Sequence, residues 1–330
     1  MITVYVREQG AILRRTGGRL QITMEGRLLD EMRLADVERV ALFGHVEITS
    51  AAMAGLLEAG IETTLLSASG RYRGRLAPAE GKNVLLRHAQ FHRYSDTAFR
   101  LRIARAVVMG KIRNARYMVL RHHYNHPDPA LAETAELLNR RCGAALQQQS
   151  IAGLMGVEGE SARVYFSSFG KMLRCEHNFK TRSRRPPLDP VNASLSFGYS
   201  LLTAEITGAA AAQGLDPSVG LLHDLDYGRP SLSLDLLEEL RQPVIDRLVL
   251  ALFNLKTLQP AHFEEREGGV YLNEAGRPRF IEMYHRAMDT EFEDKAAGER
   301  ATFRGVIRRQ ARRMRESIES QVDYVPFEPR

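Results

Sequence analysis

Residues 84–123 read VLLRHAQFHRYSDTAFRLRIARAVVMGKIRNARYMVLRHH. The stretch contains no proline, and Gly110 is its one glycine, a residue type that weakens a helix. Apolar residues recur three and four positions apart, as on one face of an α-helix; they are Leu101, Ala104, Val107, Val108, Ile112, Ala115, Met118 and Val119. The stretch therefore predicts a long helical region, which ends at the HPDP sequence of residues 126–129.

The C-terminal side of this stretch predicts further helices. Helical periodicity covers 131–154, as one helix or two, then 157–178 and 191–213, with Asn192 as a candidate cap. Pro230 and Ser231 are residue types that commonly begin a helix.

The N-terminal side, residues 2–85, has the pattern of short strands. Strands are expected at 2–6, 37–42 and 61–66, and Gly17 and Gly18 separate two further runs as a hairpin turn would. Residues 50–59 predict a short helix capped by Ser50. We therefore expect an α+β fold, in which a small, β-rich, sandwich-like domain (1–85) is followed by a larger, mostly α-helical catalytic domain (86–330).

The composition places the chain among soluble globular proteins. Of 330 residues, 44% are hydrophobic and 26% charged, and no apolar run reaches the roughly 18 residues that cross a membrane. The first residues lack the pattern of a signal peptide. Cys142 and Cys175 have no disulfide or zinc spacing, so we expect buried or idle thiols in a cytoplasmic protein.

Charge is distributed unevenly along the chain. The net charge is +6, but residues 86–199 carry 18 Lys/Arg against 8 Asp/Glu, and residues 200–299 carry 9 against 18. A basic segment of this kind suits a nucleic acid backbone, although a solvated helix face is the simpler alternative. Candidate DNA contacts are in the basic helix, in a Pro-rich loop and in a basic turn: Lys111, Arg113, Arg116, Arg182, Arg184, Arg185, Arg71 and Arg73.

An isolated carboxylate marks the segment LMGVEGESARVYF (154–166). On a helix, Glu158 and Tyr165 share a face that is otherwise apolar. A carboxylate in such a place needs a cation, a metal or a proton. Arg163, or an arginine from another segment, is the structural alternative that would pair with it.

A histidine and several acids mark the segment HDLDYGRPSLSLDLLE (223–238). Asp235 and Glu238 are three residues apart, hence on one helix face. His223 with mostly carboxylate oxygens suits Mg²⁺ or Mn²⁺ better than a closed zinc site. A lone histidine is more often structural, and spacing alone does not bring these groups to Glu158.

Motifs of several other enzyme classes are absent. The sequence has no GxxxxGK[ST], HExxH or GxSxG, and no GxGxxG after a strand. This excludes simple NTPases, HExxH zinc proteases, α/β-hydrolases and dinucleotide-dependent enzymes.

Three segments, in this order, resemble the CRISPR-associated endonuclease and integrase family of spacer acquisition, the first-numbered Cas proteins. Along the chain they are 154–166, RRPPLDPVNASLSFGY (184–199) and 223–238. The stretch GKIRNAR (110–116) and the tail near 324–327 are also similar to the family. The resemblance covers essentially the whole chain. It implies an N-terminal β domain for dimerisation or DNA contact and a helical catalytic domain.

The resemblance also implies a site, a cofactor and partners. Glu158, His223 and Glu238 would be the ligands of Mg²⁺ or Mn²⁺, with Asp235, Arg163 and Tyr165 in support. The substrates would be double-stranded DNA, both the incoming spacer fragment and the CRISPR repeat, in antiviral defence. The chain would act as a homodimer, with a small ferredoxin-like partner, the second-numbered Cas protein.

Three functions remain open on the sequence. The first is metal-dependent integration, in which a DNA 3′-OH attacks a phosphodiester at the edge of the repeat. The second is a stand-alone nuclease of branched DNA with water as nucleophile, because the ligands do not specify the nucleophile. The third is a non-catalytic DNA-binding scaffold, in which Glu158 and His223 are buried structural partners.

Overall fold

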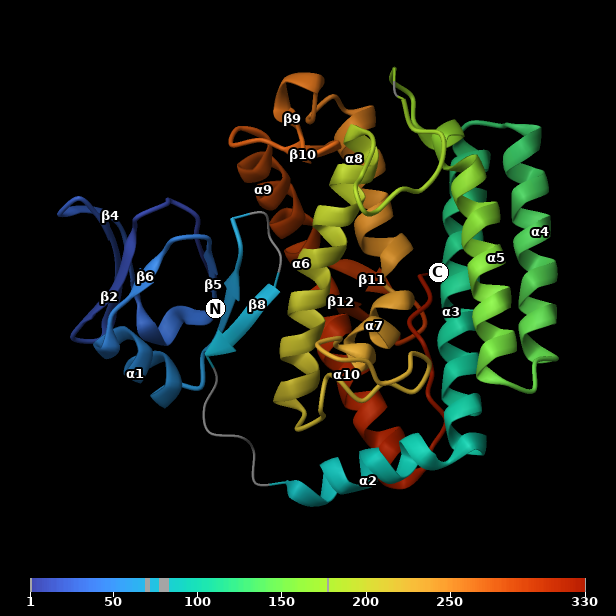
Figure 1. Cartoon of the computed structure of the whole chain (residues 1–330), viewed down its shortest axis with the longest axis horizontal. Coiled ribbons are helices and arrows are strands. Elements are labelled where there is room, and N and C mark those ends of the chain that lie inside the picture. Colours follow the sequence, from blue (N-terminus) through green and yellow to red (C-terminus); the bar gives the residue numbers. More distant parts are fainter. Residues whose placement is uncertain (1, 69–71, 77–82, 177, 330) are drawn as a thin grey trace. The chain divides into compact units, whose positions relative to one another are not determined.

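The computed structural model describes residues 2–68, 72–76, 83–176 and 178–329. The chain divides into two compact units, Met1–Val84 and Leu85–Arg330. The first unit is β-rich and the second mostly helical, so the expected α+β fold is confirmed (Figure 1). Arg71, one of the expected DNA contacts, lies outside the described residues.

The described residues of the N-terminal unit form two four-stranded sheets. In the first, β1 (Ile2–Val6), β5 (Val37–Phe43) and β7 (Glu62–Leu66) are parallel, and β8 (Tyr72–Leu76) is antiparallel to β7. In the second, β4 (Arg27–Arg33), β3 (Arg19–Met24) and β2 (Ile12–Thr16) are antiparallel, and β6 (Glu47–Ile48) pairs parallel with β2. The helix α1 (Ser50–Glu58) follows β6, and η1 (Leu34–Asp36) is a single 3₁₀ turn between β4 and β5.

Both sheets and α1 share one hydrophobic core. Val6 and Val40 from the first sheet, Leu13 and Leu20 from the second, and Leu56 from α1 belong to a single buried cluster. Alternate residues of β1 and β3 face this core, as the period of two of a strand requires. Each such side chain contributes about 1.5–3 kcal/mol by leaving water, which explains why two short-stranded sheets form one unit.

Two local expectations for this unit are wrong. Thr49, not Ser50, caps α1: its side chain accepts a hydrogen bond from the backbone N–H of Ala52 at 3.3 Å. Arg73 lies in β8, a strand paired with β7, and not in a turn. The run of arginines around Gly74 resembles a turn in sequence, yet its backbone completes the edge of a sheet.

The helical unit contains nine α-helices, counted over the described residues. The helices are α2 (Val84–Ser95), α3 (Thr97–Asn125), α4 (Pro129–Leu146), α5 (Ile151–Phe169), α6 (Pro190–Ala212), α7 (Ser231–Glu238), α8 (Arg247–Asn254), α9 (Gly276–Asp289) and α10 (Phe303–Ser320). Short helical turns are η2 (Gly170–Met172), η3 (Arg241–Asp246) and η4 (Pro260–His262). Two hairpins that the sequence did not predict are β9 (Phe263–Arg266) with β10 (Gly269–Leu272), and β11 (Phe292–Asp294) with β12 (Glu299–Ala301).

The helices form two neighbouring groups. α3, α4 and α5 lie side by side, and the mostly buried α6 contacts α7 and α10 (Figure 1). α7 and η3 both pack against α3. Segments 154–166 and 223–238, in α5 and α7, are therefore brought together on α3, and segment 184–199 reaches α7 through α6.

Helix boundaries differ from the expected ones where a polar cap interrupts the apolar pattern. Asp96 accepts a hydrogen bond from the backbone N–H of Phe99 at 3.0 Å and divides the expected long helix into α2 and α3. Ser150 caps α5 in the same way, so the region expected over 131–154 as one helix or two is divided between α4, which ends at Leu146, and the start of α5. The helix expected over 157–178 ends at Phe169. α6 is capped by Asp189, whose carboxylate accepts from the backbone N–H of Asn192 at 2.8 Å, so Asn192 is not the cap.

Gly110 does not interrupt α3 but makes room for the C-terminal segment. A Cβ at this position would lie 2.6 Å from Cβ of Pro326, a rigid ring. Replacing Gly110 with alanine is therefore expected to lower the free energy of unfolding by about 1–3 kcal/mol, because overpacking outweighs the helix propensity gained. Differential scanning calorimetry of the variant measures this as a lower Tm.

Gly143 in α4 offers the matched control. A Cβ there meets nothing within 4 Å, so Gly143→Ala is expected to raise the stability by about 0.5–1 kcal/mol. If Gly110→Ala raised the Tm as Gly143→Ala does, the close packing of Pro326 on α3 would be wrong.

Two further expectations concern the membrane and the thiols. No helix within the described ranges combines the length and the apolar character needed to cross a membrane. Cys142 and Cys175 are free and half-buried. Desolvation raises the pKa of both thiols, so neither is activated as a nucleophile.

Candidate functional site

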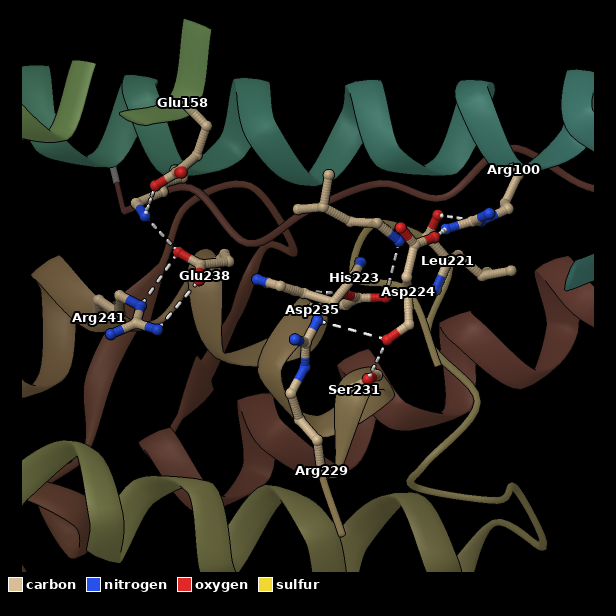
Figure 2. A network of polar contacts seen from close by, with 12 residues as sticks. Arg100, Glu158, Leu221, His223, Asp224, Arg229, Ser231, Asp235, Glu238 and Arg241 are labelled. Carbon is tan, nitrogen blue, oxygen red and sulfur yellow. Dashed lines mark hydrogen bonds and ion pairs between the residues drawn. The ribbon is translucent and has the colours of Figure 1, made fainter. Parts of the chain in front are cut away.

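Two carboxylates from different helices meet at one lysine. Glu158 lies in α5, Glu238 is the last residue of α7, and Lys111 lies in the middle of α3. The Lys111 ammonium contacts Glu158 Oε1 and lies 2.5 Å from Glu238 Oε2 (Figure 2). Segments 154–166 and 223–238, far apart in sequence, thus converge.

Glu238 is held from a second side by Arg241. The guanidinium Nε and Nη2 donate to Glu238 Oε2 and Oε1, each at 3.0 Å, in a fork-like pair (Figure 2). Burial alone would raise the pKa of Glu238, but the charges of Arg241, Lys111 and His223 outweigh it and hold the pKa far below its usual value. Glu238 is therefore kept ionised by the cations around it.

Asp235 fixes the position of His223. This fully buried carboxylate accepts from the backbone N–H groups of Leu221, Leu222 and His223 at 2.5, 3.0 and 2.9 Å. It also lies 2.7 Å from Nδ1 of the His223 ring. With Nδ1 engaged, Nε2 is the ring atom left for a metal or a proton, as in many metal sites that hold histidine through a carboxylate.

The loop that carries His223 is tied to its neighbours on two sides. Arg100 in α3 donates to the backbone oxygen of Leu221 at 3.0 Å and pairs with Asp224. Ser231 Oγ, at the start of α7, donates to the backbone oxygen of Asp224 at 2.7 Å (Figure 2). Gly220 is required at the beginning of the loop, because a Cβ there would lie 2.7 Å from the backbone oxygen of His223.

The donor set suits a divalent cation by its chemistry. Among the described residues, no three His, Cys, Asp or Glu side chains converge closely enough to hold an ion. Instead, a cation already lies between two of the candidate ligands, namely the Lys111 ammonium. Two carboxylates and an imidazole are ligand types that Mg²⁺ and Mn²⁺ accept, so the residues present fit such an ion.

Tyr165 reaches the site through other side chains and not directly. It is buried beside Asp246 and Tyr199, and Tyr199 donates to Asp246 Oδ1 at 2.5 Å. The Arg241 guanidinium lies over the Tyr199 ring, 4.6 Å from its centroid. Burial raises the pKa of Asp246 to about 6 and raises the pKa of both tyrosines well above 10. The cluster thus supports Arg241, which in turn holds Glu238.

The C-terminal segment supports the same region from another side. Glu239, next to Glu238, is fully buried and accepts from the Tyr324 hydroxyl, the backbone N–H of Phe327 and Gln310 Nε2. Burial raises the pKa of Glu239 to about 7 although these three donors act in the opposite direction. Asn114 in α3 donates to the backbone oxygens of Glu239 and Phe327 at 2.7 and 2.8 Å.

Arg163 was expected to support the site, and the structure does not bring it there. Its side chain is exposed and its ion pair is with Glu160, at 3.7 Å, because it lies on the outer face of α5. The cation that Glu158 requires comes from α3 as Lys111. Lys111 itself was expected on a DNA-binding surface, yet only 8% of it is exposed.

The other expected DNA contacts differ in exposure. Arg184 and Arg185 are exposed in the loop before α6, and Arg73 is exposed on β8. Arg182 is mostly buried and donates to Asn192 Oδ1 at 2.8 Å and to Ser196 Oγ at 2.9 Å, so it ties the loop to α6. On α3, Arg113 is exposed and pairs with Glu328 at 2.7 Å, and Arg116 is half-buried.

Sequence reasoning did not identify Lys111 as a partner of the carboxylates, nor Arg241, Asp246 and Glu239 as their support. Glu238 ends the mostly apolar helix α7 and Glu239 follows it, and two adjacent buried acids require two sets of partners. The two adjacent acids could therefore have predicted nearby cations or hydrogen-bond donors, but the sequence does not identify which residues these are.

Comparison with known proteins points to one family. The family model described as CRISPR associated protein Cas1 matches residues 4–286. A relative named CRISPR-associated endonuclease Cas1 1, from Thermus thermophilus, is 37% identical over 326 residues, which are 99% of each chain.

Solved structures share the fold. A Cas1 protein from Thermotoga maritima aligns over all of both chains with a TM-score of 0.83 and 25% identity. A casposase bound to an integration product has a TM-score of 0.85 at 23% identity, over 99% of this chain and 93% of that one. A Cas6-RT-Cas1–Cas2 complex contains a chain with a TM-score of 0.82 at 21% identity, over 99% of this chain and 36% of that one.

Proposed function

This chain belongs to the Cas1 family of CRISPR-associated proteins, and we propose that it is a metal-dependent DNA endonuclease and integrase of CRISPR adaptation. In this function the 3′-OH ends of foreign DNA fragments are joined to the CRISPR repeat by transesterification. The relative from Thermus thermophilus is named an endonuclease, and identity along nearly the whole chain supports the extension of nuclease chemistry to this protein.

One observation carries the proposal. Glu158 and Glu238, 80 residues apart in sequence, approach one cation in a buried place, and Asp235, one turn before Glu238, holds the His223 ring at 2.7 Å. Two acids that serve only stability rarely need a shared buried cation and an oriented imidazole in the same region. Such clustering of buried titratable groups is typical of functional sites.

The side chains divide the chemistry among them. Glu158, His223 and Glu238 would hold Mg²⁺ or Mn²⁺, which when bound offsets phosphate charge and lowers the pKa of the attacking hydroxyl. Asp235 keeps Nε2 of His223 available, and Arg241 fixes both oxygens of Glu238. No covalent intermediate on the protein is required, because positioning and charge supply most of the rate.

The proposed partners follow from charge and from the solved relatives. Residues 86–199, with 18 Lys/Arg against 8 Asp/Glu, supply the positive charge that a DNA duplex requires. Because a neighbour of the same fold was solved in a complex with Cas2, we propose Cas2 as a partner, with this chain acting as a homodimer. The role of the β-rich unit in dimerisation or DNA contact belongs to the same proposal.

A joining assay tests this function. The purified chain, with and without Cas2, is incubated with short duplexes and a supercoiled plasmid that carries a CRISPR array, in Mg²⁺, Mn²⁺ or EDTA. Joined products that require metal and a 3′-OH, and that a 3′-deoxy end prevents, are expected. Nicking without joining would favour the stand-alone nuclease, and DNA binding without either product would favour the scaffold.

The exposed loop before α6 is expected to contact DNA phosphates. The double variant Arg184→Glu and Arg185→Glu should lower the affinity for all duplex sequences alike and reduce the slope of log K against log salt by about 2, one for each phosphate contact. Fluorescence anisotropy at several salt concentrations measures both quantities.

A matched double variant keeps the change in charge but moves it elsewhere. Arg300 and Arg312 pair with Glu291 and Glu316 at 3.1 and 3.6 Å, and their replacement by glutamate should leave the slope unchanged. If both double variants lower the affinity and the salt slope equally, the loop contributes only net charge and does not contact the phosphates.

A further inference from the structure

Lys111 has surroundings unlike those of a lysine that only binds DNA. It is 8% exposed, in the middle of a helix, and its polar contacts are with Glu158 and Glu238. Burial of an ammonium is unfavourable unless acids surround it. Its position is therefore determined by the two carboxylates that would hold the metal.

Charge balance explains why a cation lies between the two carboxylates when no divalent ion is bound. Glu158 and Glu238 contribute two negative charges, and Lys111 and Arg241 contribute two positive ones. Without Lys111 the two carboxylates would face each other across a buried gap, with Arg241 on one side only. A divalent ion added while Lys111 remained in place would give the cluster a surplus of two positive charges.

The two cations of the cluster differ in freedom to move. Arg241 is fixed by its two hydrogen bonds to Glu238 and by its position over the Tyr199 ring. Lys111 ends in a compact charge on a flexible four-carbon chain, and its ion pairs within the described part of the chain are with the two carboxylates. Lys111 is thus the cation of the cluster that can leave its position between the carboxylates.

We propose that Lys111 is an exchangeable counter-ion, which occupies the position of the divalent ion in the metal-free protein and leaves it on metal binding. The inference rests on the proposed function and deepens it. After the exchange, the two carboxylates, Arg241 and a divalent ion have a net charge of +1, which matches one phosphodiester. The displaced ammonium remains beside the site and supplies a further positive charge for the DNA backbone. Metal loading and DNA binding are thereby coupled.

Metal affinity without DNA tests the exchange. Mn²⁺ is titrated into the full chain by calorimetry, and the Tm is recorded with and without Mn²⁺. Lys111→Met is expected to bind Mn²⁺ at least tenfold more tightly than the wild type, to have a lower Tm without metal, and to gain more Tm on Mn²⁺ binding. Arg113→Met, with the same charge change on the exposed side of α3, should alter the affinity less than twofold.

The outcomes separate the two proposals. If the wild type binds Mn²⁺, Glu158→Gln abolishes that binding, and Lys111→Met binds no more tightly than the wild type, then the exchange is wrong while the metal site stands. If the wild type binds no Mn²⁺, both are wrong.

A measurement on the unaltered protein covers the case in which Lys111→Met does not fold. Amine acylation is read residue by residue by mass spectrometry, with and without Mn²⁺. Lys111 labelling is expected to rise at least threefold with Mn²⁺, while the more exposed Lys171 stays constant as an internal control. Unchanged or reduced labelling of Lys111 would overturn the exchange.

Discussion

Replacing Glu158 with glutamine is expected to lower the rates of DNA cleavage and joining by about a thousandfold, since a metal ion contributes several kcal/mol to such reactions. The amide keeps the shape of the side chain but loses the charge that attracts a divalent ion. Lys111 retains Glu238 as its partner in the variant, so the fold and the DNA affinity should persist. Single-turnover rates, calorimetric Tm and anisotropy binding measure the three quantities.

Glu160 provides the control for this variant. It lies two residues further along α5 and pairs with Arg141 and Arg163, away from the carboxylate pair. Glu160→Gln should keep the wild-type rate within about threefold, the range of many surface changes. A Glu158→Gln protein that cleaves and joins as the wild type does would eliminate this carboxylate from the catalytic centre.

The second large effect is expected at Asp235. Its carboxylate accepts three backbone hydrogen bonds and holds Nδ1 of His223. An asparagine would present an NH₂ group to donors and leave buried N–H groups without partners. Asp235→Asn should therefore lower the free energy of unfolding by about 3–5 kcal/mol and weaken metal binding by about 10–100-fold.

Asp226 in the same loop is the matched control for Asp235. It is exposed and pairs only weakly with Arg229, at 3.4 Å, so Asp226→Asn should change stability by less than about 0.5 kcal/mol. Urea unfolding and Mn²⁺ titration measure the two effects. An Asp235→Asn variant with wild-type stability and metal affinity would mean that this carboxylate does not position His223.

The sequence could indicate the three candidate ligands but not their meeting point. Glu158 stands out as a charge on an apolar helix face. His223 and Glu238 stand out because they belong to a segment that combines a histidine with several acids. Their convergence depends on how α5 and α7 pack against α3, which no local pattern specifies. Lys111 was placed among the DNA contacts because a lysine in a basic stretch is usually exposed, whereas its surroundings are set by two distant acids.

The fold was predictable to a similar depth. The helical period over 84–123 and the short strand-like runs of residues 2–66 were sufficient to predict an α+β fold. The caps Asp96 and Ser150 could not be predicted from the apolar pattern, because one polar residue among apolar ones changes the periodicity little. The hairpins β9–β10 and β11–β12 have strands of only three or four residues, which is too short for a clear pattern.

The most direct test of the site is a crystal structure of the protein with Mn²⁺, with anomalous diffraction recorded above the manganese absorption edge. We expect one strong peak within bonding distance of carboxylate oxygens of Glu158 and Glu238 and of Nε2 of His223, with Lys111 turned away. A map without a peak at this place, in which the Lys111 ammonium still bridges the two carboxylates at saturating Mn²⁺, would contradict the proposed metal site.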